Sequence, residues 1–149
     1  MVLWRISKHL ELNGRGGIFF AGRWHHAGTP VVYLAQSPAG ALIEACVHTS
    51  ANDIPPSFTL LKIAGPDLPF DVIETAALET LHSDWPKRVE ITRDLGSDWL
   101  KTGKTALLRV PSALVPETAN YLLNPLHPDA SLFQIETSIR YPFDARLKS

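Results

Sequence analysis

One segment, Gly22–Glu44, constrains the fold more than any other part of the chain. Its sequence is GRWHHAGTPVVYLAQSPAGALIE. The apolar run predicts a strand over Val31–Ala35 that is buried on both faces. Ser37 followed by Pro38 is typical of a helix start, with serine as the N-cap and proline in the first turn. The segment therefore predicts a loop, a buried strand and a helix in direct succession.

The helix is expected over 38–49 and, because its residues are apolar or small nearly all round, it should be largely buried. A second helix is predicted over 93–102, with Thr92 as its N-cap. Further strands are predicted over 2–6, 57–65, 105–110 and within 131–143, and a strand entering a short helix over 71–81. This pattern has no regular alternation of strand and helix. It indicates an α+β domain, or a mainly β domain with peripheral helices.

The connecting segments are rich in turn-forming residues. Residues 13–28 contain many glycines and predict an extended loop, in which Phe19, Phe20 and Trp24 are expected to be buried anchors. Residues 111–125 lie between prolines and predict a series of turns.

Composition narrows the class of protein. With 149 residues, 45% of them apolar and 19% charged, the chain is expected to form one globular domain over 1–149. A net charge of −1 without a long basic run argues against direct nucleic-acid binding. No apolar span approaches the ~20 residues of a membrane helix, so no membrane association is expected. The single cysteine, Cys46, excludes an intrachain disulfide and suits a reducing compartment, which predicts a cytoplasmic protein.

Glu44 is the most informative candidate for function. Its neighbours on the predicted helix are Ala41, Leu42, Ile43, Ala45 and Cys46, so its carboxylate has little access to a solvated face. A desolvated carboxylate is paired, protonated or functional, because burying it alone costs several kcal/mol. The structural alternative is a helix whose one polar edge reaches solvent at Glu44.

Arg23, Arg5 and Tyr33 are candidates for holding a charged ligand with an aromatic ring. A guanidinium suits bidentate contact with phosphate, and Arg5 on the first strand would be a second such group. The alternative for each arginine is a surface salt bridge. Tyr33 offers a flat face on which a heteroaromatic ring can stack, and its alternative is a core tyrosine with one hydrogen-bond partner.

Other familiar motifs are missing. The nearby His25, His26, Cys46 and His48 lack the spacing of a zinc site, so no metal is expected. Gly103-Lys104-Thr105 lacks the first glycine and the preceding strand of a P-loop. Ser112 is not in the Gly-x-Ser-x-Gly turn of a serine hydrolase.

Four blocks together carry a specific resemblance. They are Gly22-Arg23-Trp24, GTPVVYLAQSPAGALIE, ALLRVPSALVP and NYLLNPLHP, and they span about residues 4–128. In this order they resemble the RES-domain family, named for arginine, glutamate and serine, which supplies the toxin of RES–Xre toxin–antitoxin pairs. The resemblance implies a strand-rich, split-sheet α+β core with peripheral helices, like the ADP-ribosyltransferase (diphtheria-toxin-like) fold.

The same resemblance implies a reaction at the bond that joins nicotinamide to ribose in NAD⁺. Family members hydrolyse NAD⁺, cleave it with inorganic phosphate as co-substrate, or transfer its ADP-ribose to a protein. NAD⁺ would therefore be a substrate, and no tightly bound cofactor is implied. The implied partner is an Xre-type antitoxin, and the resemblance is compatible with a homodimer inside the toxin–antitoxin complex. The sequence does not choose among the three reactions.

The resemblance also implies roles for individual residues. Glu44 would stabilise positive charge on the ribose, with Arg23 and Tyr33 as its catalytic partners. The implied NAD⁺-binding residues are Arg5, Arg23, Trp24, His25, Tyr33, Ser112 and Asn120. The family commonly has Gly-Gly-Arg-Trp-Asn where this chain has Ala21 and His25 at the first and last positions. These two departures leave room for a second hypothesis, a catalytically silent nucleotide-binding or interaction module.

Overall fold

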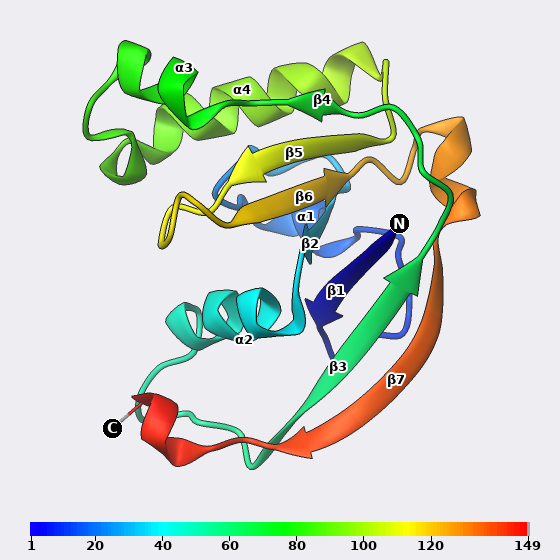
Figure 1. Ribbon diagram of the computed structural model, residues 1–149, viewed down its shortest axis with the longest axis vertical. Coiled ribbons are helices and arrows are strands. Elements are labelled where there is room, and N and C mark those ends of the chain that lie inside the picture. The colour runs from blue at the N-terminus through cyan, green and yellow to red at the C-terminus, as the bar shows by residue number, and fades with distance from the viewer. Residues whose placement is uncertain (149) are drawn as a thin grey trace.

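The computed structural model describes residues 1–148 as an α+β fold built on a seven-stranded sheet (Figure 1). The strands are β1 (Val2–Ile6), β2 (Val32–Ala35), β3 (Ser57–Ala64), β4 (Asp71–Val72), β5 (Leu107–Pro111), β6 (Ala119–Leu123) and β7 (Gln134–Pro142). The helices are α1 (Gly16–Phe19), α2 (Pro38–Val47), α3 (Thr75–Leu81) and α4 (Val89–Thr102), with 3-10 turns η1 (Trp85–Lys87), η2 (Pro128–Leu132) and η3 (Ala145–Lys148). The predicted fold class is confirmed.

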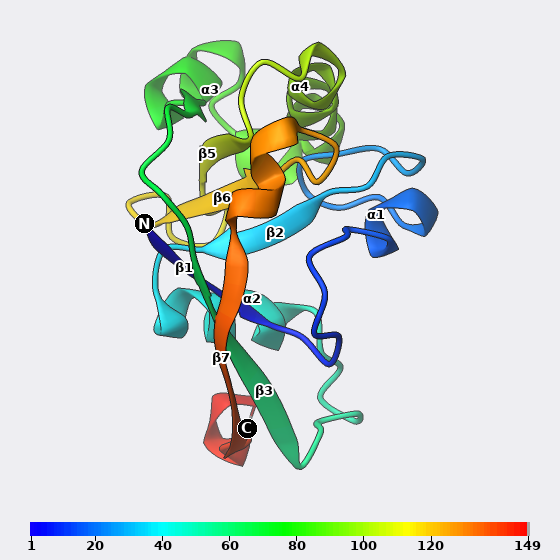
Figure 2. The same cartoon turned by 90° about the vertical axis from the view of Figure 1, so that its right-hand side faces the viewer.

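The sheet is split into two parts that meet at a narrow junction. Its strand order is β4-β5-β6-β2-β1-β3-β7, and every neighbouring pair is antiparallel except β4 with β5. At the junction, β1 and β2 pair only at Trp4 and Ala35, whereas β1 pairs with β3 along its whole length. Figures 1 and 2 show β5 and β6 running across the direction of β3 and β7. The strands therefore diverge at the junction, beside α2.

The core has two apolar clusters on opposite faces of the strands near the junction. Alternate side chains of a strand point to opposite faces, so a strand that is covered on both sides must be apolar throughout. On β2, Val32 and Leu34 join one cluster, while Tyr33 and the preceding residue, Val31, belong to the other side. The second cluster, under α3 and α4, contains Trp24, Trp85 and Trp99. The prediction of a strand buried on both faces is confirmed.

Helix α2 begins as predicted and is less buried than predicted. The Ser37 hydroxyl accepts a hydrogen bond from the Gly40 amide at 3.0 Å, which caps the first turn. The helix ends at Val47, and only Gly40 and Ala41 are buried in it. Ile43 and Val47 are 45% and 52% exposed. The expectation of a largely buried helix is wrong because α2 packs on β1 and β2 from one side only.

Three further expectations are wrong for tertiary reasons. Helix α4 begins at Val89, so Thr92 lies inside the helix and is buried instead of capping it. Phe19 and Phe20 are 64% and 76% exposed, while Trp24 is buried as expected. The predicted turns of 111–125 contain a strand, β6, in the middle of the sheet. Within residues 1–148, no helix combines the length and the apolar character needed to cross a bilayer.

Candidate active site

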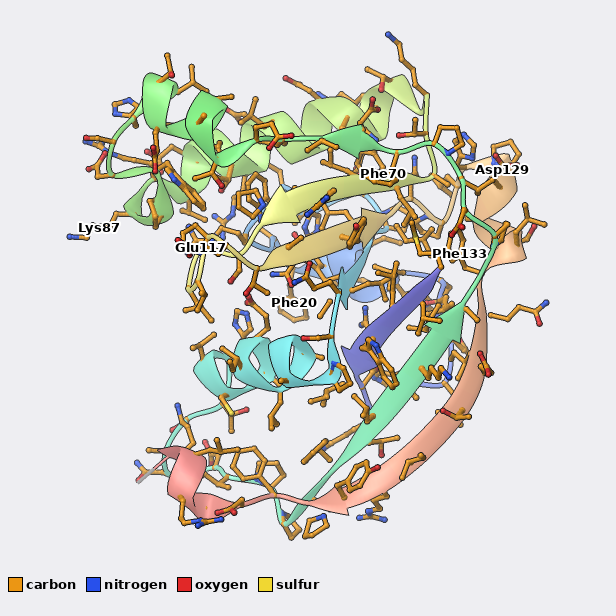
Figure 3. All side chains as sticks on the ribbon, in the orientation of Figure 1. Phe20, Phe70, Lys87, Glu117, Asp129 and Phe133 are labelled. Atoms are coloured by element: carbon orange, nitrogen blue, oxygen red, sulfur yellow. The ribbon has the colours of Figure 1, made fainter. Side chains whose placement is uncertain are left out.

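A cavity of about 930 Å³ opens where the two parts of the sheet diverge. It is lined by β1, the loop that follows it, α1, the loop before β2, β2 itself, α2, the start of the β5–β6 connection and β6 at Asn120. This volume lies in the range of pockets that hold cofactor-sized ligands. Figure 3 shows one lining side chain, Phe20, between β6 and α2 in this view.

Glu44 lies in this cavity with its two carboxylate oxygens in different environments. Oε1 accepts hydrogen bonds from the Ser112 hydroxyl at 2.7 Å and from the Asn120 side-chain amide at 2.9 Å. Oε2 accepts none from residues 1–148. The carboxylate is therefore fixed through one oxygen, and the other is available to a ligand.

Ser112 contacts Glu44 without lining the large cavity. Its side chain is 3% exposed and does not line the large cavity. The hydroxyl oxygen accepts from the backbone amides of Leu114 at 3.1 Å and Val115 at 3.4 Å, which directs its proton to Glu44. The tight turn after β5 thus holds the serine, and the serine holds the glutamate. The structure brings these residues together from positions 68 apart in the chain.

Arg5 is a partly buried cation without an acidic partner among residues 1–148. Its Nη1 donates to the backbone oxygen of Tyr33 at 3.4 Å, and its buried Nε has no hydrogen-bond partner. Burial lowers the pKa of Arg5, but an arginine remains protonated at neutral pH. A desolvated and uncompensated charge is costly, so its position in the cavity wall favours an anionic ligand.

Tyr33 and His25 form a hydrogen-bonded pair in which His25 is buried and Tyr33 is partly buried. The Tyr33 hydroxyl accepts from the Trp24 amide at 3.1 Å and lies 2.7 Å from His25 Nδ1. The Gly22 amide donates to the same Nδ1 at 3.2 Å, so Nδ1 is the acceptor and Nε2 carries the proton. Nε2 then donates to the Gly17 oxygen at 3.1 Å. Burial raises the pKa of Tyr33 to about 12 and lowers the pKa of His25, so both rings are neutral at pH 7.

Helix α4 holds the loop that carries Arg23. Arg93 Nε donates to the Gly22 oxygen at 2.7 Å, and the buried Thr92 hydroxyl donates to the Arg23 oxygen at 2.5 Å. One turn further on, Gly96 lets the Trp24 backbone approach the helix directly. The Arg23 side chain is fixed at one end, because Nη1 donates to the Pro86 oxygen at 2.7 Å. Its other nitrogens bond to none of residues 1–148.

The structure therefore gathers most of the predicted site residues in one place. The residues that line the cavity are Arg5, Arg23, Trp24, His25, Tyr33, Glu44 and Asn120. Ser112 stands behind them. The sequence interpretation missed the contribution of α4. Gly96 was the signal in the sequence for this contact. Glycine in a helix interior costs ~1 kcal/mol relative to alanine, so it often marks a close backbone approach.

For the NAD⁺ cleavage that the family resemblance implies, we expect Ser112→Ala to lower kcat about tenfold, because a hydrogen bond to a charged group contributes ~1.5–3 kcal/mol and Asn120 still holds Oε1. The KM for the substrate should change little, since Ser112 does not line the cavity. Steady-state kinetics separate the two constants. Ser131→Ala, at an exposed serine far along the chain, is the matched control. A rise in KM with unchanged kcat would show that Ser112 acts on the substrate and not through Glu44.

The neutral state of His25 predicts a pH effect on stability. Its pKa in the folded chain is below the ordinary value of 6.5, so the unfolded chain binds more protons between these two values. Stability from burying the neutral ring is thus present above pH 6.5 and is lost as the pH falls towards the folded pKa. Urea unfolding should be measured at about pH 7.5 and about pH 5. Between these values the free energy of unfolding should fall less for His25→Asn than for the wild type. Equal losses would mean that His25 is not the group responsible.

Comparison with known proteins places this geometry in a family. The model of the family described as RES domain matches residues 2–144. A protein named Toxin Res from Pseudomonas putida is 44% identical over 149 residues, which cover 99% of each chain. Another Toxin Res, from Photorhabdus laumondii, is 37% identical over 155 residues, covering 99% of this chain and 97% of the relative. A protein named Prs ADP-ribosylating toxin, from Sphingobium sp., is 35% identical over 154 residues, covering 97% and 94%.

Among solved structures, the M. tuberculosis MbcT–MbcA toxin–antitoxin complex contains a chain of the same fold. The TM-score is 0.75 at 19% identity, and the match covers 99% of this chain and 86% of that one. At this identity the likeness concerns the fold alone. The family itself is shown by the sequence comparisons. The family model matches nearly the whole chain, and so do the two relatives named Toxin Res. The chain therefore belongs to the RES domain family.

Proposed function

We propose that this protein is the toxin of a toxin–antitoxin pair and that it cleaves the nicotinamide–ribose bond of NAD⁺ in the cavity beside α2. One observation carries the proposal. A carboxylate, Glu44, is fixed through Oε1 and free at Oε2, and it shares its cavity with Arg5, a partly buried cation whose Nε has no hydrogen-bond partner. A negative group and a positive group in one cleft suit a substrate that develops positive charge next to a diphosphate.

The reaction needs electrostatic stabilisation more than proton transfer. Nicotinamide leaves as a neutral molecule when the C–N bond breaks, so no general acid is required. The ribose becomes a cationic ring, and Glu44 Oε2 would stabilise that charge and hold a ribose hydroxyl. The bonds from Ser112 and Asn120 fix the carboxylate before the substrate arrives, so little reorganisation is needed during the reaction.

Arg5, Arg23 and Tyr33 would hold the parts of the substrate on either side of the scissile bond. Arg5 and the free side of the Arg23 guanidinium would bind the diphosphate. The Tyr33 hydroxyl is occupied by Trp24 and His25, so its ring is the part that faces the substrate, and it would stack on nicotinamide. This fixation would keep the bond beside Glu44.

The acceptor of the ADP-ribose is the next question. Water would give ADP-ribose and a proton, inorganic phosphate would give a phosphorylated ADP-ribose, and a protein side chain would give a modified protein. The name of the Sphingobium relative, Prs ADP-ribosylating toxin, favours transfer as the alternative to NAD⁺ degradation. Mass spectrometry of the products, with and without phosphate, distinguishes the three outcomes. Unchanged NAD⁺ in all reactions would refute the proposal.

The toxin role has its own test. The fold shared with a chain of a toxin–antitoxin complex supports an antitoxin partner for this protein, and we propose one of the Xre type that acts in the cytoplasm. Expression of the wild type in a bacterium without the antitoxin should arrest growth and deplete NAD⁺. Glu44→Gln, expressed to the same level, should do neither. Growth arrest by both proteins would separate toxicity from the proposed chemistry.

A further inference from the structure

Phe20 is an exposed aromatic side chain in the wall of the cavity. It is 76% exposed, and its neighbour Phe19 is 64% exposed, but only Phe20 lines the cavity. Leaving such a side chain in water forgoes the stabilisation that burial of its apolar surface would contribute. The Phe20 amide donates to the Gly16 oxygen at 3.0 Å, which holds its backbone at the end of α1. An aromatic ring held in this position is available to a ligand.

Phe20 belongs to the outer part of the cavity. Three other large apolar side chains that line the cavity are also exposed, Leu10 of the β1–α1 loop at 61%, Val47 of α2 at 52% and Leu114 of the β5–β6 connection at 43%. Tyr33 and Glu44, which the proposed reaction uses, are less exposed, since both are partly buried. Among the tyrosine, tryptophan and phenylalanine side chains that line the cavity, Phe20 is the exposed one.

The lining offers the groups that the parts of a dinucleotide require. Tyr33 is suited to one flat ring, and the cations Arg5 and Arg23 are suited to a diphosphate. Phe20 supplies a second flat, apolar surface, which is more exposed than Tyr33. A dinucleotide has a ring at each end and two phosphates between them.

We propose that Phe20 stacks on the adenine ring of NAD⁺. This assignment rests on the proposed function for the identity of the whole substrate, but it can be tested without cleavage. Base–aromatic stacking contributes ~1–3 kcal/mol per base, which is about a fivefold to 150-fold change in affinity.

The test is calorimetric titration of the full chain with ADP, which has the adenine and the diphosphate but no nicotinamide. Phe20→Ala should weaken ADP binding about fivefold to 150-fold. Phe20→Tyr, which keeps the flat ring, should bind like the wild type. Phe19→Ala is the matched control, because Phe19 is equally aromatic and exposed but lies outside the cavity lining, and it should also bind like the wild type.

Nicotinamide mononucleotide, which lacks adenine, is the second probe. Its affinity should be the same for the wild type and Phe20→Ala. No ADP binding by the wild type, equal ADP binding by the wild type and Phe20→Ala, or an equal loss for both probes would overturn the adenine site. If Phe20 instead contacts a protein partner, ADP affinity will not change in the variant. The proposed function would fail on a different result, namely that NAD⁺ gives no nicotinamide.

Discussion

Glu44→Gln should reduce the rate of nicotinamide release from NAD⁺ by roughly 100-fold to 1,000-fold, the range seen when one preorganised electrostatic group is removed from an active site. The substitution keeps the size of the side chain. The glutamine oxygen can still accept from Ser112 and Asn120, so the position of the side chain should be unchanged. What changes is the atom at the place of Oε2, where a neutral amide donor replaces a negatively charged oxygen. The ribose cation would lose the charge that stabilises it, whereas the fold should be retained.

The matched control is Glu117→Gln, the same change at an exposed glutamate in the β5–β6 connection that lines neither the large cavity nor the small pocket near Ser112 (Figure 3). Its rate should equal that of the wild type. Initial rates should be measured by chromatography of free nicotinamide, with thermal unfolding of each variant recorded alongside. Equal turnover by Glu44→Gln and the wild type would remove Glu44 from the mechanism.

Gly96→Ala should destabilise the protein and also reduce its activity, although Gly96 is outside the cavity lining. A Cβ atom at this position would lie 1.7 Å from the Trp24 backbone oxygen. Alanine gains about 1 kcal/mol of helix propensity over glycine. That gain is too small to offset the overlap, because the obstacle is backbone and no change of rotamer removes it; overpacking of this kind costs ~1–3 kcal/mol or more. Helix α4 must then move away from the loop.

The activity effect follows from the contacts of α4. The same helix turn holds the Gly22 and Arg23 backbone oxygens through Arg93 and Thr92. A shift of ~1 Å in a positioning element can cost about 100-fold in rate. Gly16→Ala is the control for stability, since a Cβ there meets no atom within 4 Å. Urea unfolding and nicotinamide release measured on both variants test this account. Gly96→Ala with unchanged stability and full activity would contradict the close packing of α4 on the loop.

The parts of the fold that the sequence predicted are those set by local chemistry. The β2–α2 unit was predictable because the apolar run, the Ser37 cap and Pro38 each specify structure without distant contacts. The strand near the N-terminus and the strand–helix unit over 71–81 are confirmed for the same reason. The split sheet was implied by the family resemblance and not by periodicity.

The parts that it missed depend on long-range contacts. Strand β6 lies between turn-forming residues, and it is a strand because β2 and β5 pair with it on both sides. Thr92 resembles a cap in sequence, but its hydroxyl is used by Arg23, which is 69 residues away in the chain. Phe20 looks like a core residue, and only the tertiary structure shows it in the wall of a cavity.

The candidate site was predictable in its residues more than in their roles. Glu44 stood out because a carboxylate in an apolar helix needs an explanation, and the family blocks added Arg23, Tyr33 and Ser112. Nothing in the order of residues indicated that Ser112 donates its proton to Glu44, or that His25 is hydrogen-bonded to Tyr33. Both contacts require strands and loops that meet only in the folded chain.

The release of nicotinamide from NAD⁺ by the purified protein, with inorganic phosphate supplied and no antitoxin present, tests the central claim most directly. NAD⁺ binding should be measured by calorimetry on the same preparation. The account predicts that nicotinamide accumulates over many turnovers with the wild type and that Glu44→Gln binds NAD⁺ with little release. Tight binding of NAD⁺ by the wild type without any release of nicotinamide would contradict it and would identify a silent nucleotide-binding module.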